Sequence, residues 1–175
     1  MKVNNAELQM KFAAMCTGDK TAFEEIYNHM KTPIFTVIFR ITRDKSLSED
    51  ILQEIFLKIY RSPPTSKITN PRAYIFQMTR NLAIDSVRKQ LQFSSLESIE
   101  NHAYLPADDL PMKMDINSAM KVLPLSESQI VSFHINGELK FREIAMIMNM
   151  PLGTVLWKYQ RAIKRLKIIL SGGIS

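Results

Sequence analysis

The closest grouping of reactive side chains in this sequence is a pair of carboxylates with an amide beside them. Asp50 and Glu54 are four residues apart and Gln53 lies between them, so a helix through this stretch places all three on one face. Paired carboxylates perform general acid/base catalysis, bind metal ions or dock on a basic partner surface. No histidine, glycine-rich phosphate loop or nucleophile in a recognisable setting accompanies this pair. The pattern therefore favours a docking surface, and we expect no enzymatic activity.

Metal and disulfide chemistry have little support in the sequence. Cys16 is the only cysteine, and the three histidines are far apart along the chain. An intramolecular disulfide is therefore impossible, and no spacing suggests a metal site. We expect neither a metal nor a cofactor.

A second grouping combines cationic, amide and aromatic side chains between residues 70 and 90. This combination suits single-stranded DNA, because positive charge follows the phosphates, amides pair with base edges and rings stack on bases. Tyr74 fits a stacking role, and it fits a place in the hydrophobic core equally well. The residues expected to contact DNA here are Asn70, Arg72, Arg80, Asn81 and Arg88.

A third grouping lies near the C-terminus, where cationic side chains recur at helical spacing. A short apolar-faced helix and a turn around Asn149 precede it, which is the layout of a helix-turn-helix motif. The second helix of such a motif lies in the major groove, so its outward side chains must reach phosphates and base edges. A plain helical hairpin with a solvated basic face is the alternative. The expected DNA-contacting residues are Arg142, Thr154, Trp157, Lys158, Arg161, Lys164 and Arg165.

These outward residues are expected to play different parts. Lys164 and Arg165 lie farthest along the helix, so we expect them to reach phosphates only. Lys158 and Arg161 lie nearer its start, within reach of base edges. Trp157 suits either a thymine contact or an anchor for a protein partner.

The elements that must position these groups are all helices. Apolar residues recur at helical spacing along nearly the whole chain, and strand-type alternation is nowhere sustained. Ser46 and Ser126 each open a capping-box pattern, and Asn70 before Pro71 predicts a helix start. The predicted fold class is all-α, with two small helical domains joined by a flexible linker and the second domain a helix-turn-helix.

Charge and composition place the expected domain boundaries. Two basic stretches flank an acidic, proline-containing segment, which indicates two anion-binding modules and a connector. We expect domains at residues 1–92 and 114–175, with the linker at 93–113. No run reaches the roughly 18 apolar residues of a spanning helix, and the first residues lack the layout of a signal peptide. We therefore expect a cytoplasmic protein that is not embedded in a membrane.

Three stretches resemble the extracytoplasmic-function group of bacterial RNA polymerase sigma factors. SEDILQEIFLKIY (48–60) resembles the family's polymerase-clamp-binding helix, and NPRAYIFQMTRNLAIDSVRKQ (70–90) resembles its promoter-melting and minus-ten-recognition helix. Residues 123–166 resemble its minus-thirty-five-binding domain. The three stretches follow the family's order and spacing over most of the chain. The resemblance implies a sigma factor that brings polymerase core to particular promoters and initiates transcription.

The resemblance also implies roles for individual positions. Asp50, Gln53 and Glu54 match the clamp-contacting positions, and Arg80 with Asn81 matches the RN pair of the minus-ten helix. The loop at 62–69 matches the segment that captures a flipped non-template base. The implied partners are the core enzyme, through its beta-prime clamp and beta flap, promoter DNA and an anti-sigma factor.

The second domain matches the family's EIA, GTV and RA motifs, with departures between them. Leu156 and Trp157 stand where a Lys or Ser pair is usual, and Lys158 replaces an arginine, so the promoter sequence cannot be transferred. Lys140 replaces the usual capping Ser or Thr, and Asn149 the usual turn glycine.

Two other functions compete with this interpretation. A conventional helix-turn-helix regulator would share the C-terminal pattern, and a protein adaptor would use the acidic and basic faces without DNA. A regulator needs a sensing domain, however, and the first half shows neither a strand-helix receiver pattern nor an evident ligand pocket.

Overall fold

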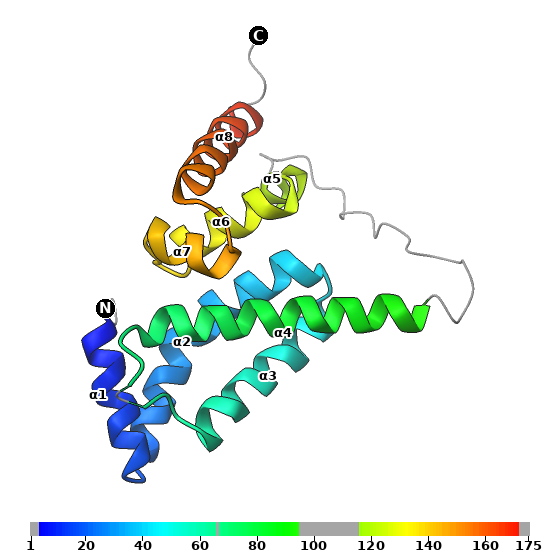
Figure 1. The fold of residues 1–175 in the computed structure, drawn as a ribbon. Coiled ribbons are helices and arrows are strands. Elements are labelled where there is room, and N and C mark those ends of the chain that lie inside the picture. The colour runs from blue at the N-terminus through cyan, green and yellow to red at the C-terminus, as the bar shows by residue number, and fades with distance from the viewer. Residues whose placement is uncertain (1–3, 66, 95–115, 172–175) are drawn as a thin grey trace.

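Eight helices form the part of the chain that the computed structural model describes, residues 4–65, 67–94 and 116–171, and no strand occurs in those ranges (Figure 1). The all-α prediction is confirmed. The expected linker, 93–113, lies outside the described residues except for its first two, which end a helix. The helices are α1 (Asn5–Cys16), α2 (Lys20–Thr42), α3 (Lys45–Arg61), α4 (Pro71–Ser94), α5 (Ile116–Val122), α6 (Leu125–Ile135), α7 (Phe141–Met148) and α8 (Leu152–Leu170).

Short polar side chains fix where the N-terminal helices begin. Asn4, Asp19 and Asp44 cap α1, α2 and α3 by accepting from backbone N–H groups of the first turn. Asn70 does the same for α4, accepting from the N–H of Ala73 at 3.0 Å, and Pro71 is the first residue of that helix, as predicted. The prediction of a cap at Ser46 is wrong, because Asp44 caps α3 two residues earlier.

The other predicted capping box, at Ser126, is also wrong. α6 begins at Leu125 with Pro124 in the cap position and no side-chain cap. A proline holds the extended backbone geometry of a cap without needing a side-chain acceptor. Ser126 is then free to face α8.

The long helix α4 lies between two groups of helices (Figure 1). On one side it packs on α2 and α3, and on the other α6 and α7 cover it and the neighbouring part of α2. One continuous apolar cluster runs through both groups, from Leu8 to Val155. A smaller cluster joins α5, α6 and α8.

The two groups meet where Phe76 of α4 packs edge-on against Phe133 of α6, with ring centroids 6.1 Å apart. Gly137, just after α6, lies in this contact. A Cβ at that position would be 2.6 Å from the carbonyl oxygen of Phe133 and 3.2 Å from the ring of Phe76. The interface is therefore closely packed and leaves no room for a methyl group.

The helix-turn-helix prediction is confirmed in its geometry. Asn149 ends α7 in the left-handed region at φ 51°, a conformation that asparagine tolerates better than most residues. Val155 and Ala162 on α8 are buried. The carboxylate of Glu143 accepts from the N–H of the cap residue Lys140 at 2.7 Å, which is the half of a capping box that the third helical residue supplies.

We predict that Gly137→Ala lowers the free energy of unfolding by about 1–3 kcal/mol, the usual cost of forcing an extra methyl into a packed site. Gly153→Ala is the matched control, because a Cβ there meets nothing within 4 Å. It should change stability by less than about 1 kcal/mol. Urea unfolding followed by circular dichroism measures both, and equal effects would contradict the close packing at Gly137.

Candidate nucleic-acid and polymerase interfaces

The acidic residues of α3 lie on the face opposite its buried stripe. Ile51, Ile55 and Ile59 are buried against the neighbouring helices, whereas Asp50, Gln53 and Glu54 are all exposed. The structure therefore brings these three side chains together on one open surface. Within the described residues no cluster of acidic, histidine and cysteine side chains could hold a metal ion.

Sequence reasoning missed one member of this surface. Leu57 lies one helical turn beyond Gln53 and Glu54 and is 51% exposed. An exposed leucine beside carboxylates adds an apolar contact to the face, and docking surfaces commonly combine the two. The sequence signal that could have identified Leu57 is its seven-residue spacing from Asp50, because residues two helical turns apart lie on one stripe of a helix. We call Asp50, Gln53, Glu54 and Leu57 the α3 face.

The five candidate DNA-binding residues of α4 divide into two sets. Asn81 and Arg88 are exposed. Arg72 is 8% exposed, and Asn70 and Arg80 are half-buried, because α6 and α7 cover that part of the helix. The second set therefore lies at the contact between the two helix groups.

Polar contacts with the C-terminal helices hold each member of the buried set. Arg72 donates from Nη1 to the carbonyl oxygen of Gly137 at 3.1 Å and approaches a carboxylate oxygen of Glu138 at 3.5 Å. Asn70 donates to Glu143 at 2.5 Å. Across the same contact, Arg80 donates from Nε to Gln129 at 3.4 Å.

Burial changes the electrostatics of these arginines. Loss of water lowers the pKa of Arg72, while the negative charges of Glu138 and Glu143 act in the opposite direction. Burial likewise lowers the pKa of Arg80. A guanidinium keeps its charge even so, because its ordinary pKa lies far above neutrality. Arg72 and Arg80 thus place two cations of α4 at the contact between the helix groups.

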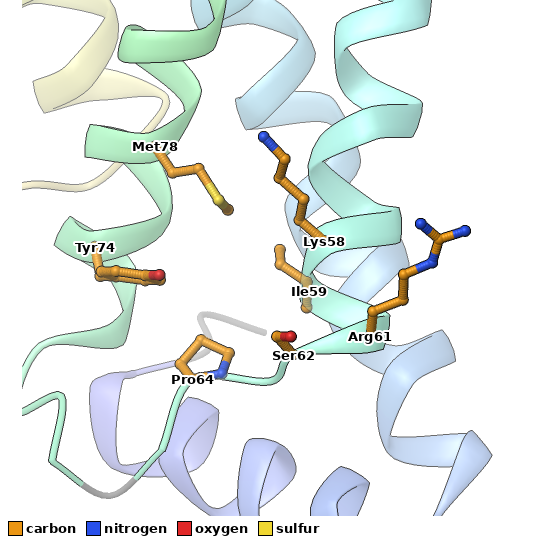
Figure 2. Close-up of a pocket in the computed structure, with 7 residues that line it drawn as sticks. All are labelled: Lys58, Ile59, Arg61, Ser62, Pro64, Tyr74 and Met78. Carbon is orange, nitrogen blue, oxygen red and sulfur yellow. The ribbon is translucent and has the colours of Figure 1, made fainter.

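A hollow of ≈310 Å³ opens between the end of α3, the loop after it and the first turns of α4. Figure 2 shows Tyr74 and Met78 of α4 reaching toward α3, with Ser62 and Pro64 of the loop below them. The guanidinium of Arg61 points away from the hollow in the same view. Tyr74 is 43% exposed, so its ring lines this hollow rather than the buried core.

The cations of α8 are partly turned toward α6. Lys158 donates to the hydroxyl of Ser126 at 3.1 Å. Arg161 and Arg165 both pair with Glu127, at 3.5 and 3.1 Å. The expectation that Arg165 is free to reach a phosphate therefore does not fit this arrangement, because its Nη1 group is occupied by a buried carboxylate.

The remaining members of the C-terminal set are accessible. Arg142 on α7 and Lys164 on α8 are exposed, and Thr154 is half-buried at the start of α8. Trp157 is 54% exposed, with the guanidinium of Arg161 over its ring at 5.0 Å. An indole, a guanidinium and a lysine are thus presented on one helix.

Sequence reasoning did not identify Glu127 as a member of this site. The residue counted only toward the acidic charge of the middle segment. Its partners lie 34 and 38 residues away, so no local spacing could have revealed the pairing.

Comparisons with known proteins cover both halves of the chain. Residues 26–92 match the model of the family Sigma-70 region 2, a stretch that contains α3 and nearly all of α4. The chain is similar to the ECF RNA polymerase sigma factor SigM of Bacillus subtilis, with 27% identity over 87% of this chain and 97% of that protein. It is also similar to the ECF RNA polymerase sigma factor SigK of Mycobacterium bovis, with 25% identity over 93% of each.

Solved structures with the same fold include two complexes. One is the sigma factor RpoE with the anti-sigma factor NepR from Bartonella quintana, at a TM-score of 0.61 and 19% identity over 87% of this chain and 98% of that one. The other is CnrH with the cytosolic domain of CnrY, at a TM-score of 0.61 and 15% identity over 95% of this chain and 98% of that one. No helix in the described residues is long and apolar enough to cross a membrane.

We predict that Arg72→Met destabilises the chain by about 1–3 kcal/mol, because it leaves the buried carbonyl of Gly137 without its donor. Arg88→Met makes the same chemical change on the same helix at an exposed site. Its effect should stay within about 0.5 kcal/mol. Denaturant midpoints of the two variants measure the difference, and indistinguishable midpoints would show that the contact contributes nothing.

Proposed function

We propose that the chain is a sigma factor of the extracytoplasmic-function group, in which α3 binds the polymerase core while α4 and α8 bind promoter DNA. The single observation that supports this best is that the family match spans two helices packed side by side, α3 with the exposed carboxylates of Asp50 and Glu54, and α4 with an excess of cationic side chains. Such a factor directs transcription without catalysing a reaction of its own. It works in the cytoplasm, where polymerase core and promoters are found.

The α3 face is the proposed site for the core enzyme. Its carboxylates suit a basic partner surface, and Leu57 supplies an apolar anchor at one end of the face. The beta-prime clamp is the proposed partner. The beta flap would contact the C-terminal helices.

The hollow beside Tyr74 is the proposed site for one flipped base of the minus-ten element. Its ≈310 Å³ volume lies within the range of small-ligand pockets. Tyr74 offers a ring for stacking. Lys58 lines the same hollow, and its ammonium pairs with Glu54 at 2.9 Å. Asn70, Arg72, Arg80, Asn81 and Arg88 would follow the separated strand along α4.

The helix-turn-helix of α7 and α8 is the proposed minus-thirty-five module. Arg142 and Lys164 are placed to contact phosphates, and Thr154, Trp157, Lys158 and Arg161 lie toward the start of the recognition helix. Arg165 leaves the expected set of phosphate contacts because Glu127 holds it.

DNA and the C-terminal helices compete for one part of α4. The side chains of Asn70, Arg72 and Arg80 contact α6, α7 or the turn between them. They can bind a DNA strand only after these helices move away. We infer that the described arrangement is a closed form, and that promoter binding needs an open one. An anti-sigma protein is a further proposed partner, by analogy with the RpoE complex.

A conventional helix-turn-helix regulator is the weaker alternative. The similar sigma factors extend over both halves of the chain, whereas a regulator would share only the C-terminal half. Reconstitution with purified core enzyme separates the two: a sigma factor forms a one-to-one complex that starts run-off transcripts from a promoter library, and a regulator does neither.

We predict that Asp50→Arg with Glu54→Arg abolishes core binding in a pull-down while the far-ultraviolet circular dichroism stays unchanged, because both residues are exposed. Glu24→Arg with Asp85→Arg reverses two exposed charges elsewhere and should bind core normally. Retained binding by the α3 variant would overturn the assignment of this helix.

We predict that Tyr74→Ala weakens binding of the holoenzyme to a non-template minus-ten strand by about tenfold, since stacking of one base on an aromatic ring contributes about 1–3 kcal/mol. Tyr74→Phe keeps the ring and should retain the wild-type affinity. Fluorescence anisotropy with a labelled strand from a promoter found by run-off screening gives both values. An alanine variant as tight as the phenylalanine variant would exclude stacking.

A further inference from the structure

The N-terminal turn of α6 contains the one carboxylate that is buried among the described residues. Glu127 is 2% exposed, and the other buried polar side chains are arginines, hydroxyls and an amide. Burial of a carboxylate is costly unless it is paired. Glu127 is paired twice, with Arg161 and Arg165 of α8.

Stability alone is a weak reason for such a pair. Buried ion pairs can often be replaced by apolar residues of similar size without loss of stability. The position of Glu127 in the first turn of α6 favours a negative charge, which a carboxylate at the surface would also provide. The more informative consequence of the ion pairs is therefore how they orient the arginine side chains of α8.

That geometry fixes the orientation of Arg161. Its Nε side faces Glu127, and the flat guanidinium lies over the ring of Trp157 at 5.0 Å. A guanidinium is rigid and planar. With Glu127 at its Nε side and Trp157 against its face, the donors that remain are the N–H groups of its two terminal nitrogens, on its terminal edge. Two parallel N–H groups on that edge match the two acceptors that guanine presents in the major groove.

Arg165 pairs with the other oxygen of the Glu127 carboxylate. It neutralises the second oxygen of the carboxylate at 3.1 Å, so Glu127 presents no net repulsion toward DNA. A released Arg165 would add one phosphate contact, which carries no sequence information. Glu127 therefore suppresses a non-selective contact and orders a selective one.

We propose that Glu127 is a positioning residue for minus-thirty-five recognition, which holds Arg161 on Trp157 with its terminal edge free to read a guanine. The inference rests on the proposed function of α8. It does not depend on the identity of the other bases in the element.

The test compares Glu127→Gln with the full wild-type chain in reconstituted holoenzyme. The probes are duplexes with the minus-thirty-five element that the wild type selects from a random library, and the same duplexes with single base-pair substitutions. Glu127→Gln should lose about tenfold in discrimination at one G·C pair. Its salt slope should steepen by about one, because Arg165 becomes free for a phosphate.

Two further variants act as controls. Arg165→Met removes the second ion pair and leaves Arg161 on Glu127, so discrimination should persist. Glu127→Asp keeps the carboxylate and should restore part of the discrimination. Trp157 is the only tryptophan, so acrylamide quenching of its fluorescence without DNA reports how well Arg161 shields the indole. Glu127→Gln should raise the quenching constant.

Each outcome decides the matter. Undiminished discrimination and unchanged quenching in Glu127→Gln, with only a lower melting temperature, would overturn the inference and leave Glu127 a packing residue. A wild-type holoenzyme without any base preference in this region would overturn the proposed role of α8 and the inference with it. Loss of discrimination in Glu127→Gln, with core binding intact, supports it.

Discussion

Arg72 is buried where the two helix groups meet, and the remaining contacts between them are arranged around it. Its guanidinium satisfies the carbonyl of Gly137, and the missing side chain of Gly137 lets Phe76 and Phe133 approach closely. A buried cation must keep its hydrogen bonds or return to water. In the observed closed arrangement Arg72 meets this requirement with the carbonyl of Gly137, and in the proposed open arrangement water or a phosphate would take that place.

This constraint connects fold and function. Residues that suit a DNA strand also suit a protein surface with exposed carbonyls and carboxylates, because both present oxygen acceptors to arginine and asparagine. Gly137, Glu138 and Glu143 offer such acceptors in the closed form. The α3 face lies away from this contact, so the proposed docking of core enzyme there does not require α4 to be uncovered.

Much of the fold could be predicted from the sequence, because the signals for it come from residues close together in the chain. Helical spacing predicted the all-helical fold, Asn70 with Pro71 predicted the start of α4, and Asn149 predicted the turn of the helix-turn-helix. Each signal lies within a few residues of the feature it predicts. Asp50, Gln53 and Glu54 of the α3 face could be predicted for the same reason, since one helix carries them within five residues. Leu57, on the same helix, was missed.

The site predictions that failed concern contacts between residues far apart in the sequence. The burial of Arg72 depends on Gly137, 65 residues away, and the pairing of Arg165 depends on Glu127, 38 residues away. A single sequence contains no periodicity that joins such positions. The capping patterns at Ser46 and Ser126 were misleading because Asp44 and Pro124, each two residues earlier, hold the cap positions instead.

The central claim, that one face of α4 contacts the C-terminal helices in the free chain and DNA in the promoter complex, is open to a direct distance measurement. Spin labels at Gln77 on α4 and Met146 on α7, both exposed, with Cys16→Ser, report the separation of the two groups by pulsed electron resonance. The account predicts one short distance in the free chain and a longer one in the complex with core and melted promoter. A short distance that persists in a transcriptionally active complex would contradict it.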